Sequence, residues 1–540
     1  MRKLGVSSRE LACLVGTVLL GALLRFANLP VRGGWDSDQG TEMLALRDAI
    51  SSGRLPTFGP TAISVATPFH HGALYYDLLL PAAWLGNGDP TWVVGEIALL
   101  SLIVIPIVWW IARSIGGAPA GLIAALLAAT SAALVGYATF IWNPTLVEPG
   151  AAVALLGAWQ AVRTRRPPWW VVSAVGAVIA VQAHIAAVVI LVPLALTFMY
   201  DIRRGPREAR SRIARWGIAG VGLFVLTYLP FIVSELGDGF ADTRSMLAYF
   251  TTDSNSAASI APPLRLLVAA IRIPAWPLTR WPIVGLKTYF GLAFLVASAF
   301  AIGLVWRLGV TSRAAESVDA DSPPADSPPA ERSGTRLIAA WLLTMAVALG
   351  LGLHAVSEFQ ALPTEQYHVV ADPLVIVAAG LIAGGLWRFR SRRWATVAGR
   401  VAAAAAVASI VAWNLGQMPP LTSPDGGWPA AQAAAARVER DTGRSHLALV
   451  SLWRDGLGPN KGTDAYGYPL LRDGIVMVAP TDASYVVLLC DTFWLGWVGG
   501  CSGPAQAEWL ATEPGGIGLT QIDSFSAAPD RILIVYRRGP

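Results

Sequence analysis

Long apolar stretches separated by short polar segments make up most of the chain between residues 11 and 415. A helix needs about 20 consecutive apolar residues to cross the hydrocarbon core of a membrane, and most of these stretches reach or approach that length, so we predict about eleven transmembrane helices. The predicted spans are 11–29, 91–113, 119–137, 145–163, 169–184, 185–200, 216–234, 287–308, 337–354, 369–388 and 398–415.

Arginine-rich segments follow every second predicted span from the fourth to the tenth. They are RTRRPP (163–168), RRGPREARSRIAR (203–215), RSGTR (332–336) and RFRSRR (388–393). Because Lys and Arg are concentrated in cytoplasmic loops, these segments and the N-terminus are predicted to be cytoplasmic. Segments 30–90 and 416–540 then lie outside the cytoplasm. We predict a multi-pass protein of the inner (plasma) membrane with an uncleaved first helix, because span 11–29 is too long for a typical signal peptide.

The overall composition agrees with this pattern. Of the 540 residues 54% are hydrophobic and only 14% are charged, which excludes an ordinary multidomain soluble protein. The net charge of +5 comes with the arginine runs, so it indicates topology and no nucleic-acid binding. The segment AESVDADSPPADSPPAERSG (315–334) has a composition that cannot bury a core, and we predict a disordered cytoplasmic loop.

The sequence changes character after PDGGWP (424–429). An Ala-rich stretch is followed by the strand-like runs HLALVSLW (446–453), YVVLLC (485–490) and RILIVYRR (531–538), separated by turn residues. We predict that the transmembrane part covers residues 1–415 and that residues 416–540 form a small extracytoplasmic α/β domain. Cys490 and Cys501 lie in this region and are expected to form a disulfide in an oxidising compartment, with two reduced thiols as the alternative.

Three acidic residues follow the first span in the stretch GGWDSDQGTEM (33–43). They are Asp36, Asp38 and Glu42, and a short amphipathic helix is predicted over 40–53. One interpretation is structural, because Asp36, Ser37 or Asp38 can cap that helix. The other is that the acids carry chemistry at the extracytoplasmic boundary of the membrane.

Several further segments share a resemblance to a known family. They are GRLPTFGP (53–60), FHHGALYYDLLLP (69–81), YATFIWNP (137–144), VQAH (181–184) and YLPFIVSELGDGFADTR (228–244). In order and topology the chain from about residue 10 to residue 415 resembles the GT-C glycosyltransferases of the protein-mannosyltransferase and aminoarabinose-transferase type. The resemblance implies a polytopic helical enzyme that uses a sugar linked to polyprenyl phosphate.

The resemblance also implies a catalytic base in the first outer loop. Many relatives have adjacent Asp and Glu residues where this chain has Asp36-Ser37-Asp38. We expect Asp38 to be the base, because Asp38-Gln39 at the start of a helix is the closer match. Asp36 would then position substrate or a divalent metal, and the pair Asp36 and Asp38 would hold such a metal if one assists. One carboxylate that deprotonates an acceptor hydroxyl in a direct displacement inverts the anomeric centre.

Other polar side chains on the predicted outer side are candidates for substrate binding. They are Glu42, His70, His71, Tyr75, Asn143, His184, Arg244 and Arg280. Arginines of the predicted outer loop 235–286, which also contains Arg265, Arg272, Trp276 and Trp281 and is followed by Lys287, can grip a phosphate or only anchor the loop to lipid headgroups. The histidines and Tyr75 can equally be structural, and no zinc-binding spacing accompanies them.

These observations predict an inverting membrane glycosyltransferase that moves a hexosyl or pentosyl unit from a lipid phosphate to an acceptor hydroxyl on a glycan, lipid or protein. The alternative is a transporter or flippase of lipid-linked sugars. A transporter is expected to have paired halves with interrupted helices, and no internal repeat is evident in the sequence. A noncatalytic glycan sensor would leave the acidic stretch 33–43 unexplained.

Overall fold

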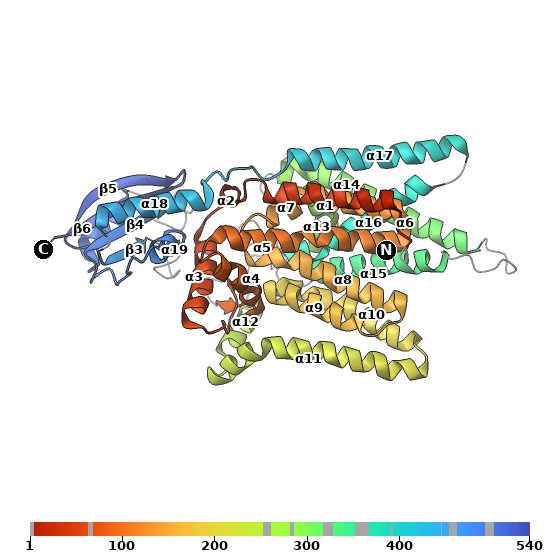
Figure 1. The fold of residues 1–540 in the computed structure, drawn as a ribbon, viewed down its shortest axis with the longest axis horizontal. Helices are drawn as coiled ribbons and strands as arrows, with labels where there is room; N and C mark the ends of the chain where they lie inside the picture. The colour runs from red at the N-terminus through yellow and green to blue at the C-terminus, as the bar shows by residue number, and fades with distance from the viewer. Residues whose placement is uncertain are drawn as a thin grey trace.

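The computed structural model describes residues 5–62, 68–251, 261–280, 286–316, 328–351, 367–389, 392–443, 445–452, 462–491 and 502–539. These residues form an elongated molecule in which a helical bundle carries a smaller unit with a β-sheet at one end (Figure 1). Helix α1 (Ser8–Phe26) starts toward the far end of the bundle and runs toward the sheet. The end of the bundle next to the sheet is named the sheet end.

The bundle consists of long apolar helices. Eight of the described helices are long and apolar enough to cross a membrane, so the chain is a multi-pass membrane protein. The bundle contains α1, α5 (Pro90–Leu102), α6 (Val104–Thr130), α7 (Ala132–Tyr137), η2 (Asn143–Leu146), α8 (Val147–Thr164), α9 (Trp169–Ala183), η3 (Ile185–Ile190), α10 (Leu191–Arg204), α11 (Arg207–Gly237), α13 (Pro262–Thr279), α14 (Leu286–Glu316), α15 (Pro328–Leu351), η6 (Val369–Ala371), α16 (Asp372–Arg388) and α17 (Arg393–Gly416). Helices α8 and α16 are largely buried, whereas α11 and α17 lie at the periphery.

A predicted interruption between two spans lies inside α6. The apolar run from Pro90 to Thr130 is broken at Gly117, where φ is 78° and ψ is 179°. Glycine adopts this backbone conformation without the steric cost of a Cβ, and Pro119 then starts the next helical segment. The break agrees with the separation of the predicted spans 91–113 and 119–137.

Two segments expected to be loops contain helices. The predicted outer loop 235–286 includes α12 (Ala241–Thr251) and α13. In the predicted disordered loop 315–334, helix α14 continues to Glu316 and α15 begins at Pro328, while residues 317–327 lie outside the described residues.

Small residues allow the central helices to approach closely. A Cβ on Gly157 of α8 would lie 2.3 Å from the backbone nitrogen of Ser173 in α9, and one on Gly176 of α9 would lie 2.2 Å from the backbone nitrogen of Ala154. Helices in a membrane pack through such small residues because lipid supplies no hydrophobic driving force between them. The contact places the C-terminal end of α9 beside the segment that enters α4.

Short elements cover the sheet end of the bundle. They are α2 (Leu29–Arg32), α3 (Ser37–Ser52), β1 (Thr61–Ala62), β2 (Phe69–His70), α4 (Leu74–Leu85) and α12. Strands β1 and β2 pair in antiparallel fashion, and α3 ends at Gly53, which has a left-handed φ of 65°. These elements connect the acidic stretch of the sequence to the histidine pair.

Residues 427–539 are named the C-terminal unit, and their described part forms a four-stranded sheet and three helices. The elements are α18 (Gly427–Thr442), β3 (Leu447–Ser451), α19 (Asp464–Arg472), β4 (Tyr485–Asp491), α20 (Pro504–Thr512), β5 (Leu519–Ala528) and β6 (Arg531–Arg538). The strand order is β3-β4-β6-β5, with β3 and β4 parallel and the other pairs antiparallel. The three strand-like runs of the sequence form β3, β4 and β6. Strand β5 was not predicted, because half of its residues are polar and none of them is buried.

The structure describes one of the two cysteines that were predicted to form a disulfide. Cys490 in β4 is disulfide-bonded and Cys13 is free. Cys501 lies outside the described residues, so the pairing of Cys490 with Cys501 stays a prediction.

Candidate active site

Asp36 forms the N-cap of α3. Its Oδ1 accepts a hydrogen bond of 2.6 Å from the backbone N–H of Ser37, and its own N–H donates to Oε1 of Gln39 at 2.8 Å. Together these residues form a capping box, which satisfies N–H groups at the start of the helix that have no partner within it. The structural interpretation of the acidic stretch therefore holds for Asp36.

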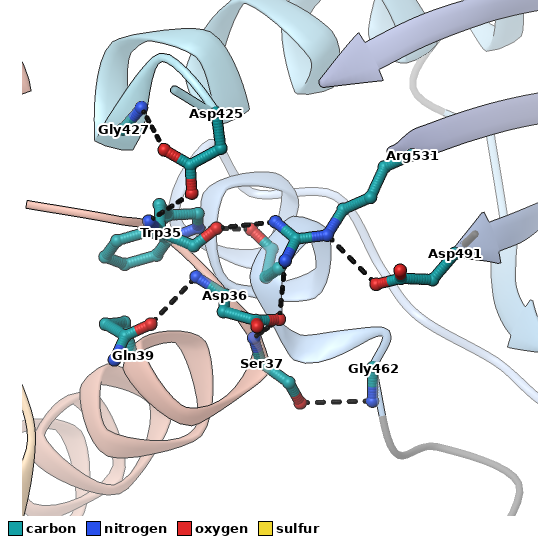
Figure 2. A network of polar contacts seen from close by, with 10 residues as sticks. Trp35, Asp36, Ser37, Gln39, Asp425, Gly427, Gly462, Asp491 and Arg531 are labelled. Carbon is teal, nitrogen blue, oxygen red and sulfur yellow. Dashed lines mark hydrogen bonds and ion pairs between the residues drawn. The ribbon is translucent and has the colours of Figure 1, made fainter. Parts of the chain in front are cut away.

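Arg531, the first residue of β6, binds the same carboxylate (Figure 2). Its Nη2 lies 2.9 Å from Oδ1 of Asp36, its Nε lies 3.0 Å from Oδ2 of Asp491, and its Nη1 donates to the carbonyl oxygen of Trp35 at 2.8 Å. Burial alone would lower the pKa of Arg531, but Asp36, Tyr466 and Asp491 raise it above its ordinary value. The network thus connects the start of α3 to the C-terminal unit.

Asp38 and Glu42 lie one turn apart on α3 and have different environments. Asp38 is exposed in the first turn of the helix, whereas Glu42 is only 5% exposed and is hydrogen-bonded to Tyr76 of α4. Burial raises the pKa of Glu42 to about 8, and the Asp38 charge contributes in the same direction. At neutral pH Glu42 is therefore mainly protonated, and Asp38 is the exposed acid of this helix face.

A pocket lies beside these elements at the sheet end. It is lined by His70, His71, Gly72, Val181, Ile185, Tyr228, Phe231, Asp242, Thr243 and Met246. In its wall Nδ1 of His70 lies 2.6 Å from Oδ1 of Asp242, and both carboxylate oxygens accept from the backbone N–H of His70 at 3.1 Å. A carboxylate partner keeps the proton on Nδ1, which makes Nε2 an acceptor.

His71 lies against the end of α9. Its Nδ1 accepts a hydrogen bond of 3.3 Å from the backbone N–H of Ile185, and its ring centroid is 5.0 Å from that of His184. Burial lowers the pKa of His71 well below its usual value, and His184 and His70 add to this effect, so the ring is neutral at physiological pH. Asn143 joins the group by donating to the carbonyl oxygen of Ala183 at 2.8 Å.

The predicted site residues thus do not all lie at one place. His70, His71, His184 and Asn143 meet around the end of α9, and the chain continues from His71 into α4, which places Tyr75 and Tyr76 near Glu42. Arg244 and Arg280 are not among the pocket residues: Arg244 donates to the carbonyl oxygen of Gly239, and Arg280 donates to that of Gln417. Asp36 faces the C-terminal unit.

Other basic residues and histidines of the predicted outer side do not reach the pocket. Arg272 and His368 are buried within the bundle, with exposed fractions of 1% and 0%. His354 and Trp281 lie outside the described residues, as does the side chain of Lys287.

Three residues that organise the site were not among the predicted site residues. Asp242 orients His70, and Glu235 fixes the start of α12 by accepting from the backbone N–H groups of Asp242 and Thr243 at 3.0 and 2.8 Å. Glu235 and Asp242 belong to the segment 228–244 that carried part of the resemblance, so the sequence could have indicated them as candidate site residues. Arg531 gave no such signal, because nothing local connects a residue at the start of β6 to residue 36.

In the described parts of the chain, no three His, Cys, Asp or Glu side chains are arranged to hold a metal ion. Asp36 and Asp38, which were predicted to hold any metal, have different surroundings. The first is bound by Arg531, and the second is exposed two residues further along α3.

No protein-family model and no curated protein sequence matches this chain. Several solved structures match it. ArnT from Cupriavidus metallidurans bound to undecaprenyl phosphate matches with a TM-score of 0.59 and 14% identity over 99% of this chain and 100% of that one. The Archaeoglobus fulgidus oligosaccharyltransferase, in complex with Zn and sulfate, matches with a TM-score of 0.52 and 14% identity over 89% and 68%. The mycobacterial arabinofuranosyltransferase AftD matches with a TM-score of 0.51 and 16% identity over 99% and 42%.

The likeness to ArnT extends over the whole of both chains, so it includes the C-terminal unit as well as the bundle. At such low identity the likeness concerns the fold. This chain therefore shares the fold of ArnT, of the archaeal oligosaccharyltransferase and of AftD.

Proposed function

We propose that the protein is an inverting membrane glycosyltransferase that moves a sugar from a polyprenyl-phosphate donor to an acceptor hydroxyl on a glycan, lipid or protein. The observation that carries the proposal is the position of Asp38. It is exposed at the start of α3, one turn from the buried Glu42 that is bonded to Tyr76 of α4. The segment that enters α4 also supplies His70 and His71 to the pocket.

The sheet end is the extracytoplasmic end in this proposal. Arginine-rich junctions lie at the opposite end of the bundle, where α10 meets α11 and where α16 is followed by α17 (Figure 1). Lys and Arg are concentrated on the cytoplasmic side of membrane proteins. The acidic helix α3, the pocket and the C-terminal unit then face away from the cytoplasm.

The pocket has the mixed lining that a lipid-linked sugar requires. The His70–Asp242 pair is a hydrogen-bonding wall, whereas Val181, Ile185 and Phe231 form apolar walls. The outer surface of the neighbouring α11 exposes many apolar side chains, as expected of a helix that faces lipid. We place the sugar at the histidine wall, where its hydroxyls can donate to Nε2 of His70, and the polyprenyl chain along this apolar side. That ArnT, which has the same fold, binds undecaprenyl phosphate supports this assignment.

Asp38 is the general base in this mechanism. Proton abstraction from the acceptor hydroxyl strengthens its attack on the anomeric carbon, while the phosphate departs with the bonding electron pair. Asp36 is held by Arg531, and Glu42 is buried and protonated, so neither is suited to act as a nucleophile. One displacement assisted by one base inverts the anomeric centre.

Sugar transfer in membranes tests the proposal. Membranes with matched amounts of the wild type, Asp38→Asn and Asp48→Asn are given a panel of radiolabelled polyprenyl-phosphate sugars. Asp48 is an exposed residue of the same helix and serves as the matched control. We expect Asp38→Asn to lose at least about 10²-fold in transfer while it still binds donor, and Asp48→Asn to match the wild type.

The same experiment separates the enzyme from a flippase. A flippase would consume no donor, would move lipid-linked sugar across the bilayer, and would be unaffected by Asp38→Asn. That combination of results would contradict the proposed function.

A further inference from the structure

We infer that Arg531 is a positioning residue, which from the C-terminal unit fixes the first turn of α3 and thereby places the Asp38 carboxylate for proton transfer. The inference rests on the proposed function, because Asp38 is the base only under that proposal. It assigns to the C-terminal unit a part in the transfer step.

The guanidinium of Arg531 uses all three nitrogens on two segments that are distant in sequence. Nε binds Asp491 within the C-terminal unit, while Nη1 and Nη2 bind the Trp35 carbonyl and the Asp36 carboxylate (Figure 2). A planar fork held in this way fixes direction as well as distance. The residue is only 8% exposed, so water screens these contacts weakly.

A second set of contacts covers one face of the same helical turn. Oγ of Ser37 accepts from the backbone N–H of Gly462 at 3.1 Å, and Oγ1 of Thr41 donates to Oδ2 of Asp464 at 2.6 Å. Between them Gly40 lies so close to α19 that a Cβ there would be 2.1 Å from the carbonyl oxygen of Asp464. Residues 37, 40 and 41 share one side of a helix, so the C-terminal unit covers that side.

Trp35 anchors the chain just before the cap. Its Nε1 donates to the carbonyl oxygen of Ala465 at 2.6 Å, its N–H donates to Oδ2 of Asp425 at 2.8 Å, and its ring lies 4.6 Å from that of Trp428. On the membrane side, the side chain of Gln39 donates to the carbonyl oxygen of Ile141 at 2.7 Å. The start of α3 is thus held from both sides.

Asp38 lies between these anchored residues and is itself exposed. The direction of the Asp38 side chain therefore depends on how the cap residue Asp36 is held. Arg531 binds the carboxylate of Asp36. A displacement of a catalytic group by about 1 Å can cost about 10²-fold in rate. We expect loss of Arg531 to lower kcat for transfer by about 10- to 100-fold and to leave the KM for donor near its wild-type value, because none of the described residues that line the donor pocket belongs to the C-terminal unit.

The experiment compares full-length wild type, Arg531→Gln, Arg531→Lys and Arg437→Gln in detergent. Arg437 makes an equivalent two-point ion pair with Asp523 elsewhere in the C-terminal unit, at 2.8 and 2.9 Å, and is the matched control. Hydrogen exchange of the peptide 36–46 reports whether α3 is held, and it does not require activity. Steady-state transfer then gives kcat and the KM for donor.

The expected result is faster exchange of peptide 36–46 and reduced kcat in Arg531→Gln, an intermediate kcat in Arg531→Lys, and wild-type behaviour in Arg437→Gln. The double variant Asp36→Asn/Arg531→Gln is expected to have the kcat of Arg531→Gln alone, because each change removes the same ion pair between Asp36 and Arg531. Unchanged exchange in Arg531→Gln, or an unchanged kcat, would overturn the inference while leaving the proposed function intact. A wild type that transfers no sugar from any donor contradicts the proposed function, and the catalytic role of Arg531 with it.

Discussion

Nδ1 of His70 lies 2.6 Å from Oδ1 of Asp242, and this pair joins β2 to α12 at the wall of the pocket. Asp242 is in turn placed by Glu235, which caps α12. The three residues form a chain of contacts from the end of α11 to the pocket. Such a partner fixes both the tautomer and the orientation of an imidazole.

Replacing Asp242 with Asn is expected to weaken donor binding. The amide cannot hold the proton on Nδ1 of His70 as a carboxylate does, so Nε2 is no longer presented uniformly as an acceptor. We expect the KM for donor to rise about tenfold with a smaller change in kcat. Steady-state transfer assays check this, with Asp238→Asn at the exposed end of α11 as the control. An unchanged KM for donor in Asp242→Asn would show that the His70–Asp242 pair does not contribute to donor binding.

Glu42 gives the protein a predictable dependence of stability on pH. Its pKa in the folded state is about 8, above the ordinary value of 4.5, because burial disfavours the charged form. The free energy of unfolding therefore carries no penalty from Glu42 below about pH 4.5, and it falls as the pH rises through 8. Thermal unfolding in detergent is expected to show a lower Tm at pH 9 than at pH 6.

Glu42→Gln should remove most of that decline. Glutamine keeps the length and polarity of the side chain but cannot ionise, so we expect the variant to exceed the wild type in stability at pH 9 by several kcal/mol. Glu508→Gln, a change at an exposed position in α20, is the control and should follow the wild type. If the Tm of Glu42→Gln fell between pH 6 and pH 9 as much as that of the wild type, another group would be responsible for the pH dependence.

Gly40→Ala is expected to disturb the contact between α3 and α19. The added Cβ would lie 2.1 Å from the carbonyl oxygen of Asp464, which is backbone and cannot move aside cheaply. Forced shifts of this kind cost about 1–3 kcal/mol, and we expect a lower Tm. Gly222→Ala in α11 has no atom within 4 Å of its new Cβ and should be neutral or slightly stabilising. Equal Tm values for the two variants would contradict the close packing at Gly40.

The orientation of the bundle can be measured by labelling. In a Cys13→Ser background, Asp48→Cys in α3 should react with a membrane-impermeant maleimide in intact cells. Arg204→Cys at the end of α10 should react only after permeabilisation, because Arg-rich junctions are expected to be cytoplasmic. The opposite pattern would place the acidic helix and the pocket in the cytoplasm.

The apolar pattern of the sequence predicted the membrane class, because span length and Arg distribution are local properties of a sequence. The pattern was less informative about the outer segments. Helix α13 lies in a segment that was expected to be an outer loop. Strand β5 was not predicted because half of its residues are polar and none of them is buried.

At the candidate site, the structure shows where the predicted residues lie, and their roles stay predictions. His70, His71, His184 and Asn143 lie around the end of α9, and each belongs to a segment that carried the family resemblance. The different surroundings of Asp36 and Asp38 could not be predicted from the sequence. The ion pair of Asp36 with Arg531 joins positions almost 500 residues apart, and local patterns contain no information on such a contact.

The most direct test of Asp38 as the general base is single-turnover sugar transfer by purified protein that has been loaded with a radiolabelled polyprenyl-phosphate sugar and is then mixed with acceptor. The measured quantity is the rate constant of product formation for the wild type and for Asp38→Asn at equal donor occupancy. We expect product of inverted configuration with the wild type and a rate constant at least about 10²-fold lower in Asp38→Asn. Equal rate constants for the two proteins would show that Asp38 is not the base.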